Sequence, residues 1–131
     1  MLYLLDSNVC IVYLNGRSVV VQEKVRNELS NIVVCSVVKS ELFYGALRTQ
    51  NPERTLVRQQ IFLNQFISLP FDDLAVMVCA QIRAQLASRG TPIGSNDLQI
   101  AAIALTHHLT LVTHNVREFS RVDGLQIEDW E

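Results

Sequence analysis

The chain has 131 residues, of which 49% are hydrophobic and 18% are charged, and its formal net charge is −2. This length suits one domain, and the apolar content is high enough to bury a core, which excludes a disordered chain. Because the net charge is slightly negative, the chain is not a strongly basic protein that attracts nucleic acid over its whole surface. A nucleic acid would have to bind through a local patch of positive charge.

Nothing in the sequence predicts a membrane protein. No apolar run reaches the roughly 18 residues of a membrane span, and the start MLYLLDSN has neither the basic flank nor the length of a signal peptide. We therefore expect a cytoplasmic protein whose residues 1–131 form a single domain. The cysteines Cys10, Cys35 and Cys79 are odd in number and lie among aliphatic residues, so we expect small buried side chains rather than a disulfide or a zinc site.

The first third of the chain alternates strand and helix patterns. LYLL (2–5) is typical of a buried parallel strand, and Asp6-Ser7-Asn8 favours a helix start directly after it, with a stop near Asn15-Gly16. A second helical segment (18–29) leads to IVVC (32–35), another strand candidate.

The middle of the chain is mainly helical. SVVKSELFYGALRT (36–49) predicts a helix, and Pro52 begins a second one (52–66), so the two are expected to form a hairpin that is also a candidate dimer surface. SLPF (68–71) is a weak strand candidate, and a long helix (72–90) follows with acids at its start.

The last third returns to a strand and helix pattern. Ser95-Asn96-Asp97 is a possible cap for a helix over 95–108, LTLVT (109–113) is the clearest β-branched strand, and LQIEDW (125–130) alternates as an edge strand does. Strands separated by helices predict an α/β sandwich with a mostly parallel five-stranded sheet.

Three acidic residues lie close to the ends of expected strands or at the start of an expected helix. Asp6 closes the first strand, Glu41 lies on the apolar stripe Val38, Glu41, Leu42, Gly45, and Asp97 lies on a similar stripe with Ile100, Ala101, Ala104 and Leu105. Each has an ordinary explanation, since Asp6 and Asp97 suit helix caps and Glu41 suits a stripe border or an arginine partner. Together they indicate a shared site, because ligands bind beyond the carboxyl ends of parallel strands.

Carboxylates gathered in this way favour a metal ion. If they converge within about 5 Å, each like-charge pair costs on the order of 3 kcal/mol at an effective dielectric of 20. Mg²⁺ relieves this with oxygen ligands while keeping waters for phosphate binding, and Mn²⁺ should substitute. Such an ion can activate water for in-line hydrolysis of a phosphodiester, and a second ion could steady the leaving oxygen.

Four segments carry a family resemblance: LLDSN (4–8), SVVKSELFYGA (36–46), GTPIGSNDLQIAAIA (90–104) and LVTHNVREFSRVDGL (111–125). In order and spacing they resemble the PIN-domain ribonucleases, and end to end the chain is similar to the VapC toxins of bacterial toxin–antitoxin pairs. The resemblance implies a PIN-like three-layer sandwich with strand order 3-2-1-4-5 and Mg²⁺- or Mn²⁺-dependent RNA cleavage, with transfer RNA as a candidate substrate. It also implies homodimers and hetero-oligomers with a VapB-type antitoxin whose tail lies across the active site.

Matching motif to motif places the family's acids on Asp6, Glu41 and Asp97 as metal ligands. The fourth acidic position falls on Asn115, which supplies no charge, so Glu118 three residues later could replace it or act through water. The catalytic set is then Asp6, Glu41, Asp97, Asn115 and Glu118, supported by Ser7, Asn8, Ser36, Asn96 and Thr113. This departure leaves a second metal site in question.

Local positive charge supplies candidate RNA contacts, although any one group also fits a solvated helix face. The arginines in question are Arg48, Arg54, Arg58, Arg83, Arg89 and Arg117.

Three other functions compete with this interpretation. Histidine catalysis by His107, His108 and His114 would need no metal, although the first two suit the end of a helix. A receiver-like signalling domain needs adjacent acids after the first strand and a late lysine, which the sequence lacks. A catalytically weakened PIN domain that only binds protein or RNA is supported by Asn115 and opposed by the three retained acids.

Overall fold

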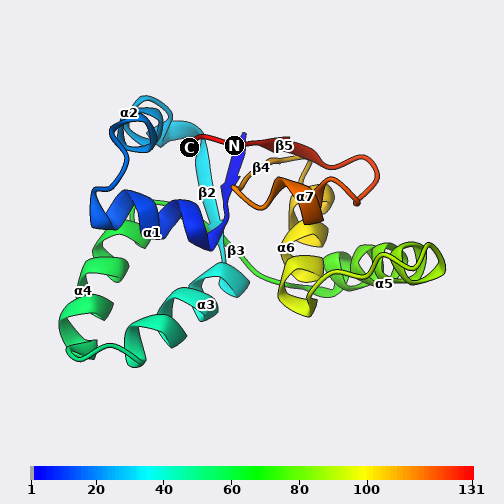
Figure 1. Ribbon diagram of the computed structural model, residues 1–131, viewed down its shortest axis with the longest axis horizontal. Coiled ribbons are helices and arrows are strands. Elements are labelled where there is room, and N and C mark those ends of the chain that lie inside the picture. The colour runs from blue at the N-terminus through cyan, green and yellow to red at the C-terminus, as the bar shows by residue number, and fades with distance from the viewer. Residues whose placement is uncertain (1) are drawn as a thin grey trace.

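The structure is a computed structural model that describes residues 2–131, and its centre is one five-stranded sheet in which every strand pair is parallel (Figure 1). The sheet order is β3-β2-β1-β4-β5, as expected. The strands are β1 (Tyr3–Leu5), β2 (Ile32–Cys35), β3 (Ile67–Leu69), β4 (Thr110–Val112) and β5 (Gln126–Glu128).

Helices flank the sheet, with α1 to α4 on one side and α5 and α6 on the other in Figure 1. Their bounds are α1 (Ser7–Asn15), α2 (Val19–Asn27), a 3₁₀ turn η1 (Leu29–Asn31), α3 (Ser36–Leu47), α4 (Pro52–Leu63), α5 (Asp73–Ser88), α6 (Ser95–Thr106) and α7 (Val116–Phe119). No helix within residues 2–131 is both long and apolar enough to cross a bilayer.

Burial follows the sheet order. The central strands β1 and β2 consist almost entirely of buried residues, which explains their continuous apolar sequences, whereas Ile67 of the edge strand β3 is largely exposed. All three cysteines are free, Cys10 and Cys35 are buried, and Cys79 is half-buried. The predicted burial is therefore confirmed for Cys10 and Cys35 and is wrong for Cys79.

The helical hairpin is confirmed as α3 followed by α4. Asn51 caps α4 by accepting a hydrogen bond from the backbone N–H of Arg54, and Pro52 occupies the first helical turn. Figure 1 shows the pair projecting from the carboxyl end of β2. On α3 the buried stripe continues through Ala46, and Gly45, which the sequence placed on that stripe, is exposed.

The sequence misplaced three local features. β3 ends at Leu69 rather than at residue 71, because Pro70 has no N–H to donate to a neighbouring strand. The short helix α7 was not foreseen, since four residues are too few for a periodic pattern. Gly94 is the N-cap of α6 and no side chain makes a cap hydrogen bond there, so Asp97 is not used for capping.

Candidate active site

Asp6 is the most tightly held of the acids. It lies directly after β1, its side chain is 4% exposed, and Oδ1 accepts a 2.8 Å hydrogen bond from the backbone N–H of Ser7 at the start of α1. The expected capping role is therefore real. Burial raises the pKa of Asp6, and the hydrogen bonds from Thr113 and Ser7 oppose that rise.

Thr113 links the ends of β4 and β1. Its hydroxyl donates a 2.7 Å hydrogen bond to Asp6 Oδ2 and accepts a 3.0 Å hydrogen bond from the backbone N–H of Asn115. Thr113 is fully buried, so both bonds lie in a low-dielectric environment. One hydroxyl thus fixes the second Asp6 oxygen and the turn that leads into α7.

Glu41 projects from α3 toward the same place. Its Oε1 atom is buried and has no hydrogen-bond partner within residues 2–131. Burial raises the pKa of Glu41, the charge of Asp6 adds to the rise, and hydrogen bonding from Asn96 and Ser7 opposes it. A buried carboxylate oxygen without a donor is costly, so this atom is suited to receive a ligand.

Asp97 lies in the first turn of α6, where the charges of the other three acids act on it. Burial and a hydrogen bond with Glu118, together with the charges of Asp6, Glu118 and Glu41, raise the pKa of Asp97 to about 7. Glu118 in α7 is in turn held by Asn115, whose Nδ2 donates a 3.3 Å hydrogen bond to Glu118 Oε2. The structure thus brings Asp6, Glu41, Asp97 and Glu118 together.

The expected supporting residues differ in what they contact. The backbone N–H of Ser7 and the hydroxyl of Thr113 donate to Asp6, and Asn96 lies near enough to Glu41 to oppose the rise of its pKa. Asn8 and Ser36 are exposed, and their side chains make no hydrogen bond within the described residues.

The donor set fits a hard divalent cation. It consists of carboxylate oxygens, one of them orphaned and buried, and burial together with the charges of neighbouring acids raises the pKa values of Glu41 and Asp97. Within the described residues the oxygens of Asp6, Glu41 and Asp97 do not all lie within 4.8 Å of one another, so the three acids form a wider group than a closed set of direct ligands would. These side chains therefore suit a divalent metal ion.

The candidate RNA-binding arginines are all exposed, but two of them are already engaged. Arg89 makes a bidentate ion pair with Asp123, with contacts of 3.2 and 2.6 Å, and Arg58 Nη2 donates a 2.6 Å hydrogen bond to the carbonyl of Leu14. Arg48 lies 5.3 Å from the ring centre of Tyr44.

The histidines do not form a catalytic pair at this site. His107 caps the C-terminus of α6 and His108 follows it, so both lie at the opposite end of that helix from Asp97, about 15 Å away along the axis. His114 instead lies in the turn between β4 and α7, where it contacts acids at the C-terminal end of the chain. Sequence spacing alone did not reveal that contact.

Comparison with known proteins shows which family the chain belongs to. The PIN domain profile matches residues 3–125. The chain is 38% identical to the "tRNA(fMet)-specific endonuclease VapC" of Salmonella typhimurium over 98% of this chain and 97% of that protein, and 34% identical to "Ribonuclease VapC2" of Haemophilus influenzae with the same coverage. It also matches a chain in the crystal structure of DNA-bound VapBC from Salmonella typhimurium with a TM-score of 0.94, 38% identity and full coverage of both chains. The chain therefore belongs to the PIN domain family and, within it, to the VapC ribonucleases.

Proposed function

We propose that residues 1–131 form one PIN domain that acts in the cytoplasm as the toxin of a VapBC-type pair, cleaving RNA phosphodiesters with Mg²⁺ or Mn²⁺. The observation that carries this proposal is that Asp6, Glu41 and Asp97 lie near enough for the charge of one to act on another. They follow β1 or lie in α3 and α6, yet in addition to burial the charge of Asp6 raises the pKa of Glu41, and the charges of Asp6, Glu118 and Glu41 raise that of Asp97. Acids that served only to stabilise the fold, as helix caps for example, would have no reason to lie where their charges repel.

The three acids would hold the ion, each in a different way. Asp6 uses one lone pair of each oxygen for Ser7 and Thr113, so the remaining lone pairs keep a fixed direction. Glu41 offers the buried Oε1 atom, which has no other partner. Asp97 is protonated in part near neutral pH without metal, and we expect it to release that proton when a cation binds.

Glu118 and Asn115 divide the fourth acidic position between them. Glu118 supplies the charge, and Asn115 orients it through the 3.3 Å amide hydrogen bond. Glu118 would accept a proton from an attacking water molecule, a role supported by its position beside Asp97. An ion held by Asp6, Glu41 and Asp97 would supply Lewis acidity toward the scissile phosphate and would lower the pKa of bound water.

We propose a transfer RNA as the substrate, because the Salmonella relative is described as specific for tRNA(fMet). Phosphate contacts would come from Arg48, Arg54, Arg83 and Arg117, with Arg58 and Arg89 contributing less because protein groups already occupy them. Such contacts add affinity that falls with rising salt and carry no sequence information.

The hairpin offers a surface for a VapB-type antitoxin and for a second copy of the chain. A groove of about 550 Å³ along α3 is lined by Lys39, Phe43, Tyr44 and Leu47, among others. Val57 and Ile61 on α4 are also exposed. Several relatives were solved as VapBC complexes, and contiguous exposed apolar side chains are typical of such interfaces.

The test is cleavage of transfer RNA by the purified chain, with the new RNA ends read by sequencing. Cleavage should require Mg²⁺ or Mn²⁺, stop in EDTA and be absent in Asp97→Asn. Activity that survives EDTA would favour the histidine mechanism. A folded protein that binds Mg²⁺ and RNA without cleaving any RNA would favour a binding module.

A further inference from the structure

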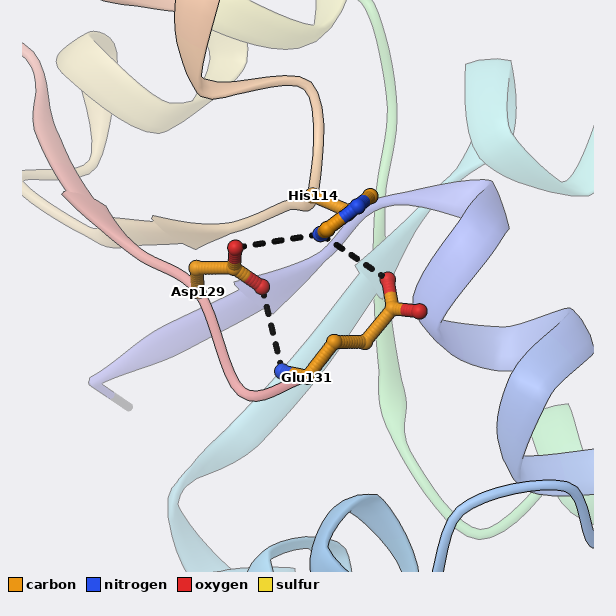
Figure 2. Close-up of side chains that lie close together, drawn as sticks. All are labelled: His114, Asp129 and Glu131. Carbon is orange, nitrogen blue, oxygen red and sulfur yellow. Dashed lines mark hydrogen bonds and ion pairs between the residues drawn. The ribbon is translucent and has the colours of Figure 1, made fainter.

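A second group of metal-ligating side chains lies outside the carboxylate site. This group consists of His114, Asp129 and Glu131, each of which offers one ligand atom. Within residues 2–131 it is the group of three metal-ligating side chains whose ligand atoms all lie within 4.8 Å of one another. Figure 2 shows the imidazole of His114 between the two carboxylates. Its Nδ1 atom is 3.0 Å from Asp129 Oδ2 and 3.5 Å from Glu131 Oε2.

Parallel pairing of β4 and β5 creates this group. Val112 is in register with Glu128, and the backbone N–H of Thr113 donates a 2.9 Å hydrogen bond to the carbonyl of Glu128. The residues that follow each strand therefore emerge side by side, which places His114 next to the segment that begins at Asp129.

Buried residues next to the ligands hold both of the chain segments that carry them. His114 follows Thr113, which is fully buried. Asp129 and Glu131 flank Trp130, which is 3% exposed, packs edge-on against Tyr3 at 5.1 Å, and donates from Nε1 to Glu128 Oε1. Both acids are exposed on either side of this buried residue. The backbone N–H of Glu131 also donates to Asp129 Oδ1 at 3.0 Å (Figure 2).

The spacing of the ligand atoms matches a coordination sphere. With zinc–nitrogen and zinc–oxygen bonds near 2.1 Å, neighbouring ligand atoms are separated by about 3.0 Å in octahedral and about 3.4 Å in tetrahedral geometry. The two separations from His114 Nδ1, 3.0 and 3.5 Å, lie at or close to these values, and all three ligand atoms lie within 4.8 Å of one another. One imidazole and two carboxylates suit a borderline ion, whereas Mg²⁺ prefers oxygen ligands alone.

We propose that His114, Asp129 and Glu131 form a second cation site that takes Zn²⁺ or a similar borderline divalent ion and keeps positions open for water. The ion ties the turn between β4 and α7, which carries Asn115, to the segment after β5. This site is independent of the ribonuclease proposal, because none of its ligands belongs to the carboxylate site.

The test is calorimetric titration of the tag-free full chain with Zn²⁺ in millimolar Mg²⁺. The Asp6→Asn/Asp97→Asn background removes the first site. This protein should still bind one equivalent of Zn²⁺ with a Kd below about 100 μM, and Zn²⁺ should raise its melting temperature. Adding His114→Ala or Asp129→Asn should weaken binding at least about tenfold and abolish the shift.

A matched control is His108→Asn, which removes another exposed histidine and leaves a residue that tolerates the left-handed backbone at φ 54°. It should leave Zn²⁺ binding unchanged. Absence of binding in the background variant, or binding that survives His114→Ala and Asp129→Asn, would overturn the proposal and leave a simple ion pair. Circular dichroism establishes that each variant is folded.

Discussion

The hydroxyl of Thr113 donates a 2.7 Å hydrogen bond to Asp6 Oδ2 across 107 positions of sequence. This bond joins the carboxyl ends of two neighbouring strands, and both partners are buried. It is therefore the contact through which the fourth strand determines the direction of the first acid.

Thr113→Val keeps the shape of the side chain and removes this donor. We expect stability to fall by about 1–3 kcal/mol, because a buried acceptor loses its partner, and metal affinity and cleavage rate to fall about 10–100-fold. Denaturant unfolding, metal titration and RNA cleavage measure the three effects. Thr113→Ser retains the hydroxyl and should recover most of the activity; equal rates for the valine and serine variants would contradict the role given to the bond.

Asn115 and Glu118 should behave as one unit. Glu118→Gln removes a charge and should reduce the metal-dependent rate by about 100-fold or more, whereas Asn115→Ala removes only an orienting donor and should cost about tenfold. The double variant should be little worse than Glu118→Gln alone, because Asn115 acts through Glu118. Single-turnover cleavage measures these rates, and additive losses would show that Asn115 has a separate role.

Asp97→Asn should separate activity from stability. Cleavage should fall by about 10³-fold or more, while the metal-free protein becomes more stable at pH 8 by roughly 1–2 kcal/mol, since one of the repelling charges is gone and Asp97 is only half-buried. Asp73→Asn is the matched control, because Asp73 also lies in the first turn of a helix and is exposed. It should alter neither property appreciably.

The stability of the metal-free protein should depend on pH through Asp97. Its pKa rises from 3.8 to about 7 on folding, so its protonated form favours the folded state. This contribution is fully present below about pH 4 and is lost as pH rises toward 7. The raised pKa values of Asp6 and Glu41 act in the same direction. Urea unfolding of wild type and Asp97→Asn between pH 4 and 8 should show a widening difference with rising pH, and parallel curves would count against the raised pKa.

The sequence predicts the sheet well because its strands are short, apolar and separated by helices. LYLL and IVVC lie in the buried middle of the sheet, so their composition alone indicates strands, and the order of all five strands followed from the family resemblance. The strand at 68–71 was placed less accurately, because an edge strand is half exposed and has a weaker apolar pattern.

The candidate site was foreseen in its residue types more than in its contacts. Asp6, Glu41 and Asp97 stand out because acids interrupt apolar stripes. The bond between Thr113 and Asp6 and the contact of His114 with Asp129 depend on which strands are neighbours and in what register, and neither property has a local sequence signature. The residues that sequence reasoning did not connect are therefore those brought together by parallel pairing.

The central place of β1 also affects how the protein is made. β1 is synthesised first but pairs with β4, which is synthesised much later. The surroundings of Asp6 are therefore incomplete until Thr113 and Glu118 have been added to the chain. A chain synthesised only as far as α6 would consequently contain Asp6, Glu41 and Asp97 but neither the neighbouring strand nor the hydroxyl that holds Asp6, so the site is completed only when the last fifth of the chain has been made.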